Sequence, residues 1–116
     1  YIDDVVEGIY RCYQKPASRN ENFDFMNPDP STSSAPHRVF NIGNSQPIQL
    51  LKFIEILEDA LGQQAIKNLE PMQPGDVIAT AANTEALENW VGFQPSTPIE
   101  VGVKRFADWY KKFYNN

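Results

Sequence analysis

Residues 15–37 are the segment that most limits how this chain can fold. They contain four prolines, at positions 16, 28, 30 and 36, and a serine and threonine cluster at 31–34. Because proline fixes φ and lacks a backbone N–H, such a segment continues neither a helix nor a strand. Irregular loops of this length inside a compact domain are uncommon and often functional. We therefore expect regular structure only before and after residues 15–37.

Helical periodicity is clear on both sides of this segment. Apolar residues recur at spacings of three and four over 3–14, 47–61 and 98–113, which predicts three amphipathic helices. A shorter helix should follow a cap at Asn83 or Thr84 and end at Gly92, as Gly62 should end the second helix. The stripes expected to be buried are Val5, Val6, Ile9, Tyr10 and Tyr13, then Leu50, Ile54, Leu57 and Leu61, then Ile99, Val103, Phe106, Tyr110 and Phe113.

Strand signals are weaker than helix signals. Residues 38–42 have the apolar, β-branched pattern of a short strand, and a second short strand is predicted at 78–81. Residues 65–69 are expected to be extended. Since a lone strand needs a partner, the chain taken alone is predicted to be α+β, with helices outweighing strands.

Size and composition narrow the functional classes. The 116 residues should form one domain that buries roughly two-thirds of its unfolded surface. A net charge of −5 argues against nucleic acid and against an anionic membrane surface. Cys12 and His37 are the only cysteine and histidine, so neither an intrachain disulfide nor a clustered metal site is expected. The single cysteine and the lack of a membrane-spanning apolar run suggest a cytoplasmic protein.

Residues 70–77 have the chemistry of a binding loop. Pro71 and Pro74 stiffen the backbone, and Gly75 allows a close approach by a ligand. Gln73 can donate and accept hydrogen bonds, while the carboxylate of Asp76 can accept two from a sugar diol. An ordinary turn is the commoner role of a Pro-Gly-Asp sequence, so both readings stay open at this point.

Four segments in a fixed order resemble a known family. Residues 1–8 read YIDDVVEG, 38–44 read RVFNIGN, 70–77 read EPMQPGDV and 97–103 read TPIEVGV. Together they resemble the C-terminal part of nucleotide-sugar epimerases of the extended short-chain dehydrogenase/reductase class, closest to the UDP-glucuronate 4-epimerase group. The resemblance covers essentially the whole chain. It implies a helix-rich, substrate-binding C-terminal lobe (residues 1–116) of an α/β, Rossmann-type enzyme.

The family's catalytic and cofactor motifs are missing from this sequence. No G-x-x-G-x-x-G turn follows a strand, and no tyrosine is followed four residues later by lysine. The resemblance therefore implies that NAD serves the full-length enzyme on an absent N-terminal lobe. We expect no catalytic residue in this fragment and no NAD binding by it.

The resemblance also implies four substrate-binding positions. Asp76 corresponds to an aspartate on the ribose hydroxyls, and Gln73 replaces an arginine on the diphosphate in galactose epimerases, so it brings no charge. Leu50 falls where an apolar residue packs on uridine, although a core leucine is at least as good a reading. Thr80 falls at a wall of the hexose site. One departure is Ala81-Ala82-Asn83, where the family often has Tyr-Ala-Asp.

Three functions are compatible with these observations. The first is a UDP-sugar-binding part of a NAD-dependent 4-epimerase, which requires the absent NAD-binding lobe as its partner. The second is a free-standing, non-catalytic module that binds a nucleotide or a protein. The third is a related dehydratase or reductase, which residues 72–77 disfavour. Apolar surface left uncovered by the absent lobe would favour self-association, for example as a homodimer.

Overall fold

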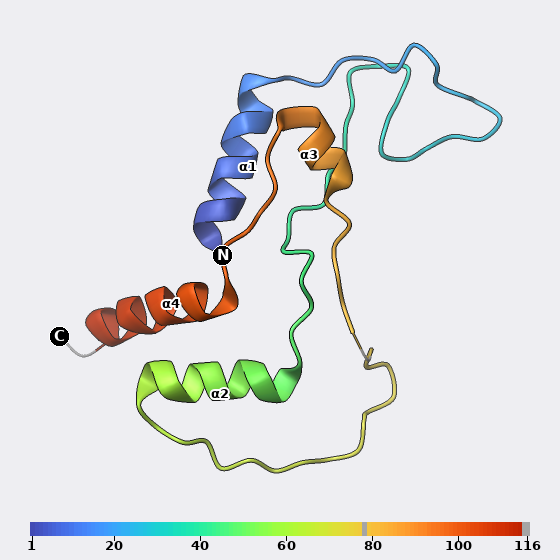
Figure 1. Ribbon diagram of the computed structural model, residues 1–116. Coiled ribbons are helices and arrows are strands. Elements are labelled where there is room, and N and C mark those ends of the chain that lie inside the picture. The colour runs from blue at the N-terminus through green and yellow to red at the C-terminus, as the bar shows by residue number, and fades with distance from the viewer. Residues whose placement is uncertain (78, 115–116) are drawn as a thin grey trace. The chain divides into compact units, whose positions relative to one another are not determined.

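The computed structural model describes residues 1–77 and 79–114, and regular structure there consists almost wholly of helices (Figure 1). The helices are α1 (Ile2–Gln14), α2 (Leu50–Leu61), α3 (Glu85–Val91) and α4 (Ile99–Tyr114). The described residues form two compact units. One unit holds Tyr1 and residues 46–77, 79–81 and 96–114, with α2 and α4, and the other holds residues 2–45 and 82–95, with α1 and α3.

The predicted helices are confirmed, and their ends follow from backbone geometry. Gly62 and Gly92 have φ of 70° and 64°, a left-handed conformation suited to glycine, and end α2 and α3 as expected. The start of α2 was predicted three residues too early, at Pro47. Gln49 is still extended, with φ −65° and ψ 138°, and its carbonyl accepts the first helical bond, 3.0 Å from the Phe53 nitrogen.

The predicted strands are largely wrong. Thr32 and Arg38 form an isolated antiparallel bridge, next to a 3.0 Å bond from Val39 N–H to the Ser31 carbonyl. Residues 39–42 and 79–81 are not strands, and Ile78, where the second predicted strand began, lies outside the described residues. A strand persists only where a neighbouring segment supplies backbone hydrogen-bond partners. For residues 38–42 the neighbouring segment is a short turn at residues 31–32, which is too short to pair with a whole strand. The helix-rich prediction is confirmed, and the Rossmann context stays a prediction.

Residues 15–37 contain no helix, as predicted, and side chains hold their turns. Asn20, Asp24 and Asp29 each accept a hydrogen bond from the backbone N–H two residues later, at 2.8–3.0 Å. Ser33 does the same for Ala35 at 3.2 Å. Bonds from Ser31 lower the pKa of the Asp29 carboxyl. Short polar side chains that bond to the backbone in this way replace the ladders of helix and sheet.

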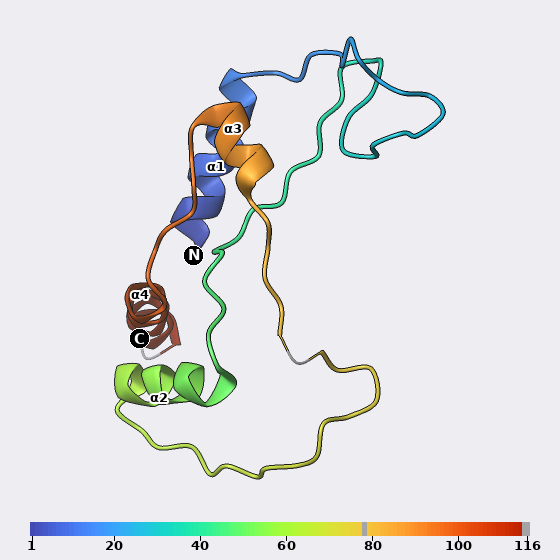
Figure 2. The same ribbon diagram turned by 45° about the vertical axis from the view of Figure 1, so that its right-hand side comes forward.

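The first unit is organised by α2 and α4, which lie side by side in Figure 1 and Figure 2. Its buried residues include Ile56 on α2 and Val103 and Ala107 on α4. The Lys111 ammonium donates to the Ala60 carbonyl at 2.8 Å and joins the two helices at the end of α2.

The stripes predicted to be buried on these helices are confirmed only in part. Val103 is buried, and Ile54, Leu57, Leu61 and Ile99 are half-buried. Leu50 is 71% exposed, and Phe106, Tyr110 and Phe113 on α4 are exposed as well. Each helix buries one narrow face against the other, and small residues of α4 occupy that contact. The wide aromatic face of α4 therefore stays at the surface. Its five rings contact one another along the helix: Phe106, Trp109, Tyr110, Phe113 and Tyr114.

The second unit is organised around Gly8 of α1 and Leu87 of α3. Leu87 is fully buried. A Cβ on Gly8 would lie 3.4 Å from Ile42 Cδ1 and 3.7 Å from Leu87 Cδ2, which is ordinary van der Waals contact, so the Gly8 face of α1 lies against these side chains. This contact corrects the prediction for α1, because the helix buries its Gly8 face. Of the predicted apolar stripe, Val5 is half-buried, and Val6, Ile9, Tyr10 and Tyr13 are exposed.

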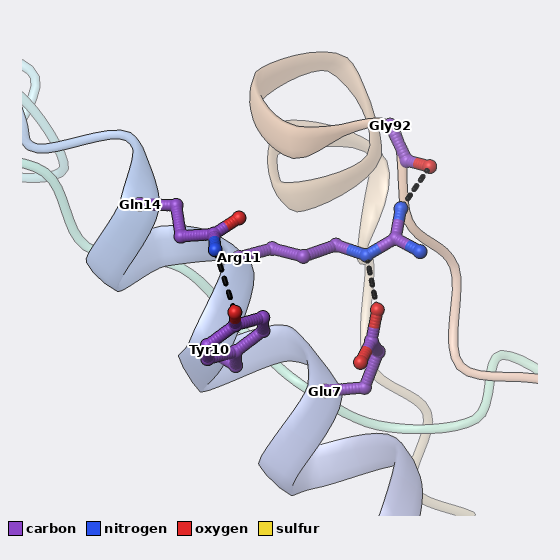
Figure 3. A network of polar contacts seen from close by, with 5 residues as sticks. All are labelled: Glu7, Tyr10, Arg11, Gln14 and Gly92. Atoms are coloured by element: carbon purple, nitrogen blue, oxygen red, sulfur yellow. Dashed lines mark hydrogen bonds and ion pairs between the residues drawn. The ribbon is translucent and has the colours of Figure 1, made fainter.

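Two cations at the C-terminal end of α1, Arg11 in its last turn and Lys15 just beyond it, bind carbonyls at the C-terminal end of α3. Figure 3 shows Arg11, which donates to the Gly92 carbonyl at 3.1 Å while its Nε contacts the Glu7 carboxylate at 2.5 Å. The Lys15 ammonium donates to the Trp90 carbonyl at 2.6 Å. Cations at a helix C-terminus complement the macrodipole and satisfy free carbonyls. The same view shows Gln14 donating to the Tyr10 hydroxyl at 2.7 Å.

The faces of α1 and α4 described above leave large apolar side chains exposed, among them Ile9 at 57% and Phe113 at 62%.

Candidate functional site

Residues 73–76 form a tight turn that supports itself. The Asp76 N–H donates to the Gln73 carbonyl at 3.1 Å, and the Gln73 N–H donates back to the Asp76 carboxylate at 3.3 Å. Gly75 has φ of 97°, which glycine adopts readily, and Pro74 precedes it. A proline followed by a glycine at positive φ is the signature of a type II turn. The loop can therefore be both an ordinary turn and a binding loop, because the turn itself exposes the groups that could bind a ligand.

The side chain of Gln73 is engaged inside the loop. Its Nε2 donates to the Pro71 carbonyl at 3.0 Å. Gln73 and Asp76 are both exposed. The Gln73 amide thus stiffens the approach to the turn, and a bond from Nε2 to a ligand phosphate would compete with the bond to Pro71.

Leu50 and Thr80 lie elsewhere in the same unit. Leu50 is the first residue of α2 and is 71% exposed, so its reading as a core leucine is wrong. Thr80 is exposed in an irregular segment that precedes α3. The structure thus brings Gln73 and Asp76 into direct contact and places Leu50 and Thr80 on separate segments. The roles of all four in binding a nucleotide-sugar stay predictions.

Glu58 joins α2 to the segment that leads to the binding loop, and its role was not predicted from the sequence. Its carboxylate accepts hydrogen bonds from the Ala65 N–H at 2.7 Å and from the Lys67 ammonium at 2.6 Å. The Lys67 bond, followed by the Ala65 bond, lowers the pKa of Glu58 below its ordinary value of 4.5. A pair that spans a helix end has no fixed spacing, so helical periodicity could not reveal it.

A second polar and aromatic cluster surrounds Trp90 in the other unit. The guanidinium of Arg38 lies 4.7 Å from the centre of the Trp90 ring, and Arg38 Nε is buried without a hydrogen-bond partner. A cavity of about 200 Å³ opens beside them, with Ser31 and Asn89 in its lining. This cluster contains none of the predicted site residues.

The remaining candidate groups, His37 and Cys12, show no arrangement typical of a catalytic or metal site among the described residues. His37 is exposed, as expected, with Nε2 3.4 Å from the Pro30 carbonyl, and Cys12 is half-buried. Within residues 1–77 and 79–114, no three histidine, cysteine or acidic side chains gather in a way that could hold a metal ion. No helix in this described part of the chain has the length and apolar character needed to cross a membrane.

Comparison with known proteins supports the sequence resemblance. No family model matches the chain. It is 46% identical over 114 residues to Protein CapI of Staphylococcus aureus, covering 98% of this chain and 34% of that protein. It is 43% identical over 118 residues to a protein of Rhizobium meliloti named "Probable UDP-glucuronate 4-epimerase", again covering 98% and 34%.

A plant relative has the same name in unqualified form. UDP-glucuronate 4-epimerase 1 of Arabidopsis thaliana is 35% identical over 115 residues, which cover 98% of this chain and 26% of that protein. The chain therefore spans about a third or less of the curated relatives it matches. Nearly all of its sequence is homologous to part of proteins named UDP-glucuronate 4-epimerase, which confirms the resemblance found from its motifs.

Proposed function

We propose that this chain, homologous to part of the UDP-glucuronate 4-epimerases, is the UDP-sugar-binding part of a NAD-dependent nucleotide-sugar 4-epimerase. The observation that carries the proposal is the turn at 73–76. It holds the carboxylate of Asp76 at the surface, next to backbone groups that a polar ligand can use. A carboxylate that accepts two hydrogen bonds suits the two hydroxyls of a ribose.

The chemistry of the remaining positions supports the same ligand class. Leu50 offers an exposed apolar side chain to a base, and Thr80 offers a hydroxyl to a sugar. Gln73 is uncharged, so a diphosphate would be held by dipoles or by cations from a partner lobe. The chain therefore supplies recognition and positioning in our proposal, and the sugar is UDP-glucuronate or its 4-epimer.

NAD binding is not assigned to this chain. A dinucleotide pyrophosphate is usually held by a glycine-rich turn that opens a helix. The residues immediately before α2, α3 and α4 are Gln49, Thr84 and Pro98. None of these three helix starts follows a glycine-rich turn, so we derive no hydride-transfer step from these residues.

Titration with UDP, followed by backbone NMR, tests the proposal. We expect resonances of residues 73–80 to shift with a Kd on the order of 1 mM, because one lobe supplies only part of the pocket. Asp76→Asn keeps the size of the side chain but should weaken binding severalfold. Asp108→Asn, on α4, is the matched control and should leave the shifts unchanged. If high millimolar UDP moves no resonance in this loop, the assignment of the site is wrong.

A protein-binding module is the second candidate, because the aromatic face of α4 is exposed. The two candidates predict different results when this chain is mixed with the rest of an epimerase. The part of the Rhizobium meliloti relative outside the matched segment can be produced separately and mixed with this chain. Epimerisation of UDP-glucuronate by the mixture alone would favour the first candidate. Formation of a complex without activity, and without UDP binding, would favour the second.

A further inference from the structure

Glu58 makes four hydrogen bonds at the end of α2. Its backbone carbonyl accepts from the N–H groups of Gly62 at 2.8 Å and Gln63 at 3.2 Å. Its carboxylate accepts from the Ala65 N–H at 2.7 Å and the Lys67 ammonium at 2.6 Å. One residue therefore both closes the last turn of the helix and holds the chain that follows it.

The carboxylate of Glu58 is shielded from water, unlike other acids on α2. Its side chain is 10% exposed, and that of its partner Lys67 is 35% exposed. The Lys52–Glu55 pair on the same helix is 58% and 59% exposed, with a longer contact of 3.3 Å. Exposed pairs contribute little to stability, whereas shielded, charge-assisted bonds are stronger. The bonds from Lys67 and Ala65 lower the pKa of the Glu58 carboxyl, as expected for bonds to its charged form.

Beyond Lys67, few contacts fix the direction of the loop relative to α2. Figure 1 shows residues 63–77 leaving α2 as a long loop without helix or strand, and the side chains of this loop are exposed. The turn at 73–76 closes on itself, so its internal geometry does not depend on α2. Its direction relative to α2 does depend on how the first residues of the loop are held.

We infer that Glu58 is a positioning residue for the loop that carries Gln73 and Asp76. By holding Ala65 and Lys67 against the last turn of α2, it shortens the free part of the loop to the residues beyond Lys67. A shorter free segment loses less conformational entropy when a ligand orders it. The role in ligand binding rests on the proposed function, but the hold on Ala65 and Lys67 is a property of the unliganded chain.

Three variants separate the parts of this contact. Glu58→Ala removes both carboxylate bonds. Glu58→Gln keeps an acceptor for Ala65 but loses the charge that attracts Lys67, and Lys67→Met removes only the ammonium. Glu55→Gln is the control, because Glu55 lies on the same helix in an exposed pair. Far-UV circular dichroism establishes that each variant keeps its helices.

Amide hydrogen exchange without ligand is the first measurement. We expect the Ala65 amide to exchange at least about tenfold faster in Glu58→Ala, with smaller increases in Glu58→Gln and Lys67→Met. The control should match the wild type. Unchanged exchange at Ala65 in Glu58→Ala would overturn the inference. If Glu58→Ala does not fold, unchanged exchange at 65–67 in both Glu58→Gln and Lys67→Met would do so.

UDP titration of the same proteins is the second measurement. The expected result is a Kd raised by about threefold or more in Glu58→Ala, with Asp76 itself unaltered. The variants could exchange faster while the wild type binds no UDP. That result would reject the proposed function but would still support the contact of Glu58 with Ala65 and Lys67. UDP binding that is equal in wild type and Glu58→Ala, despite faster exchange, would overturn the positioning role alone.

Discussion

Lys15 and Trp90 exchange two hydrogen bonds across the α1–α3 contact. The Lys15 ammonium donates to the Trp90 carbonyl at 2.6 Å, and the Trp90 indole N–H donates to the Lys15 carbonyl at 3.2 Å. The ammonium also lies 4.4 Å from the centre of the indole ring. These two bonds join the C-terminal end of α1 to the C-terminal end of α3.

Loss of the indole N–H should therefore weaken the second unit. Trp90→Phe keeps an aromatic ring for the Lys15 cation but removes the donor to the Lys15 carbonyl. We expect the free energy of unfolding to fall by about 1 kcal/mol, the usual value of one hydrogen bond. Urea denaturation followed by circular dichroism measures it. Trp109→Phe on the exposed face of α4 is the control, and an equal loss there would count against the pair.

Gly8 should tolerate one added carbon but not a large side chain. Gly8→Ala places a Cβ 3.4 Å from Ile42 Cδ1 and gains about 1 kcal/mol of helix propensity, so its thermal midpoint should stay level or rise. Gly8→Leu adds carbons where the core is filled and should cost about 1–3 kcal/mol. Both midpoints can be read by circular dichroism. A stable Gly8→Leu variant would show that α1 does not pack through this face.

Gly75 should be needed for the turn at 73–76. Its φ of 97° is costly for any residue with a Cβ, so Gly75→Ala should open the Gln73–Asp76 bonds at a cost of about 1–2 kcal/mol. NMR exchange of the Asp76 amide reports this opening directly. Gly102→Ala, inside α4, should leave that amide unchanged. Equal protection of the Asp76 amide in wild type and Gly75→Ala would contradict the turn geometry.

The hold of Glu58 on Ala65 and Lys67 should weaken in acid. Because folding lowers the Glu58 pKa below 4.5, its contribution is complete above that pH and is lost as pH falls through the lowered value. Ala65 amide exchange, corrected for its intrinsic pH dependence, should show loosening only below about pH 4.5. Glu58→Gln should remove this dependence. A loosening centred near neutral pH would point to another group.

The aromatic face of α4 should cause self-association. Phe106, Trp109 and Phe113 are each more than half exposed, and contiguous apolar surface of this kind usually marks an interface. Sedimentation velocity should show a mass that rises with concentration. The double variant Trp109→Lys with Phe113→Lys should stay closer to monomeric. The control is the double variant Leu69→Lys with Val77→Lys, which adds the same charge away from α4. A concentration-independent monomer would contradict this prediction.

Local signals in the sequence predicted the helices and their glycine ends well. Gly62 and Gly92 end α2 and α3 because a left-handed residue is a local requirement that one amino acid reveals. The buried faces were predicted less well. Apolar periodicity identifies the apolar side of α4, but whether Phe106 is covered depends on what packs there. In α1 the contact face was set by Gly8, a residue that a hydrophobic pattern does not count.

The local geometry of the candidate loop could be predicted in part, while the roles of its residues in binding stay predictions. The Pro74-Gly75 signature predicted a turn, and the structure adds that Asp76 closes it. Leu50 was open to two readings because a leucine at a helix start fits a core and a ligand surface equally well. Glu58 escaped prediction because its partners lie beyond Gly62, where helical spacing no longer applies.

The side-chain bonds of residues 15–37 make this segment suited to variation in length. Four of these bonds, accepted by Asn20, Asp24, Asp29 and Ser33, come from a backbone N–H only two residues away, so each of those four small turns is self-contained. Residues added between two such turns would leave both intact, and loop entropy grows only slowly with length. An epitope tag or a fluorescent domain placed between Asp24 and Asp29 would therefore provide a handle on this protein while α1 and α3 keep their contact.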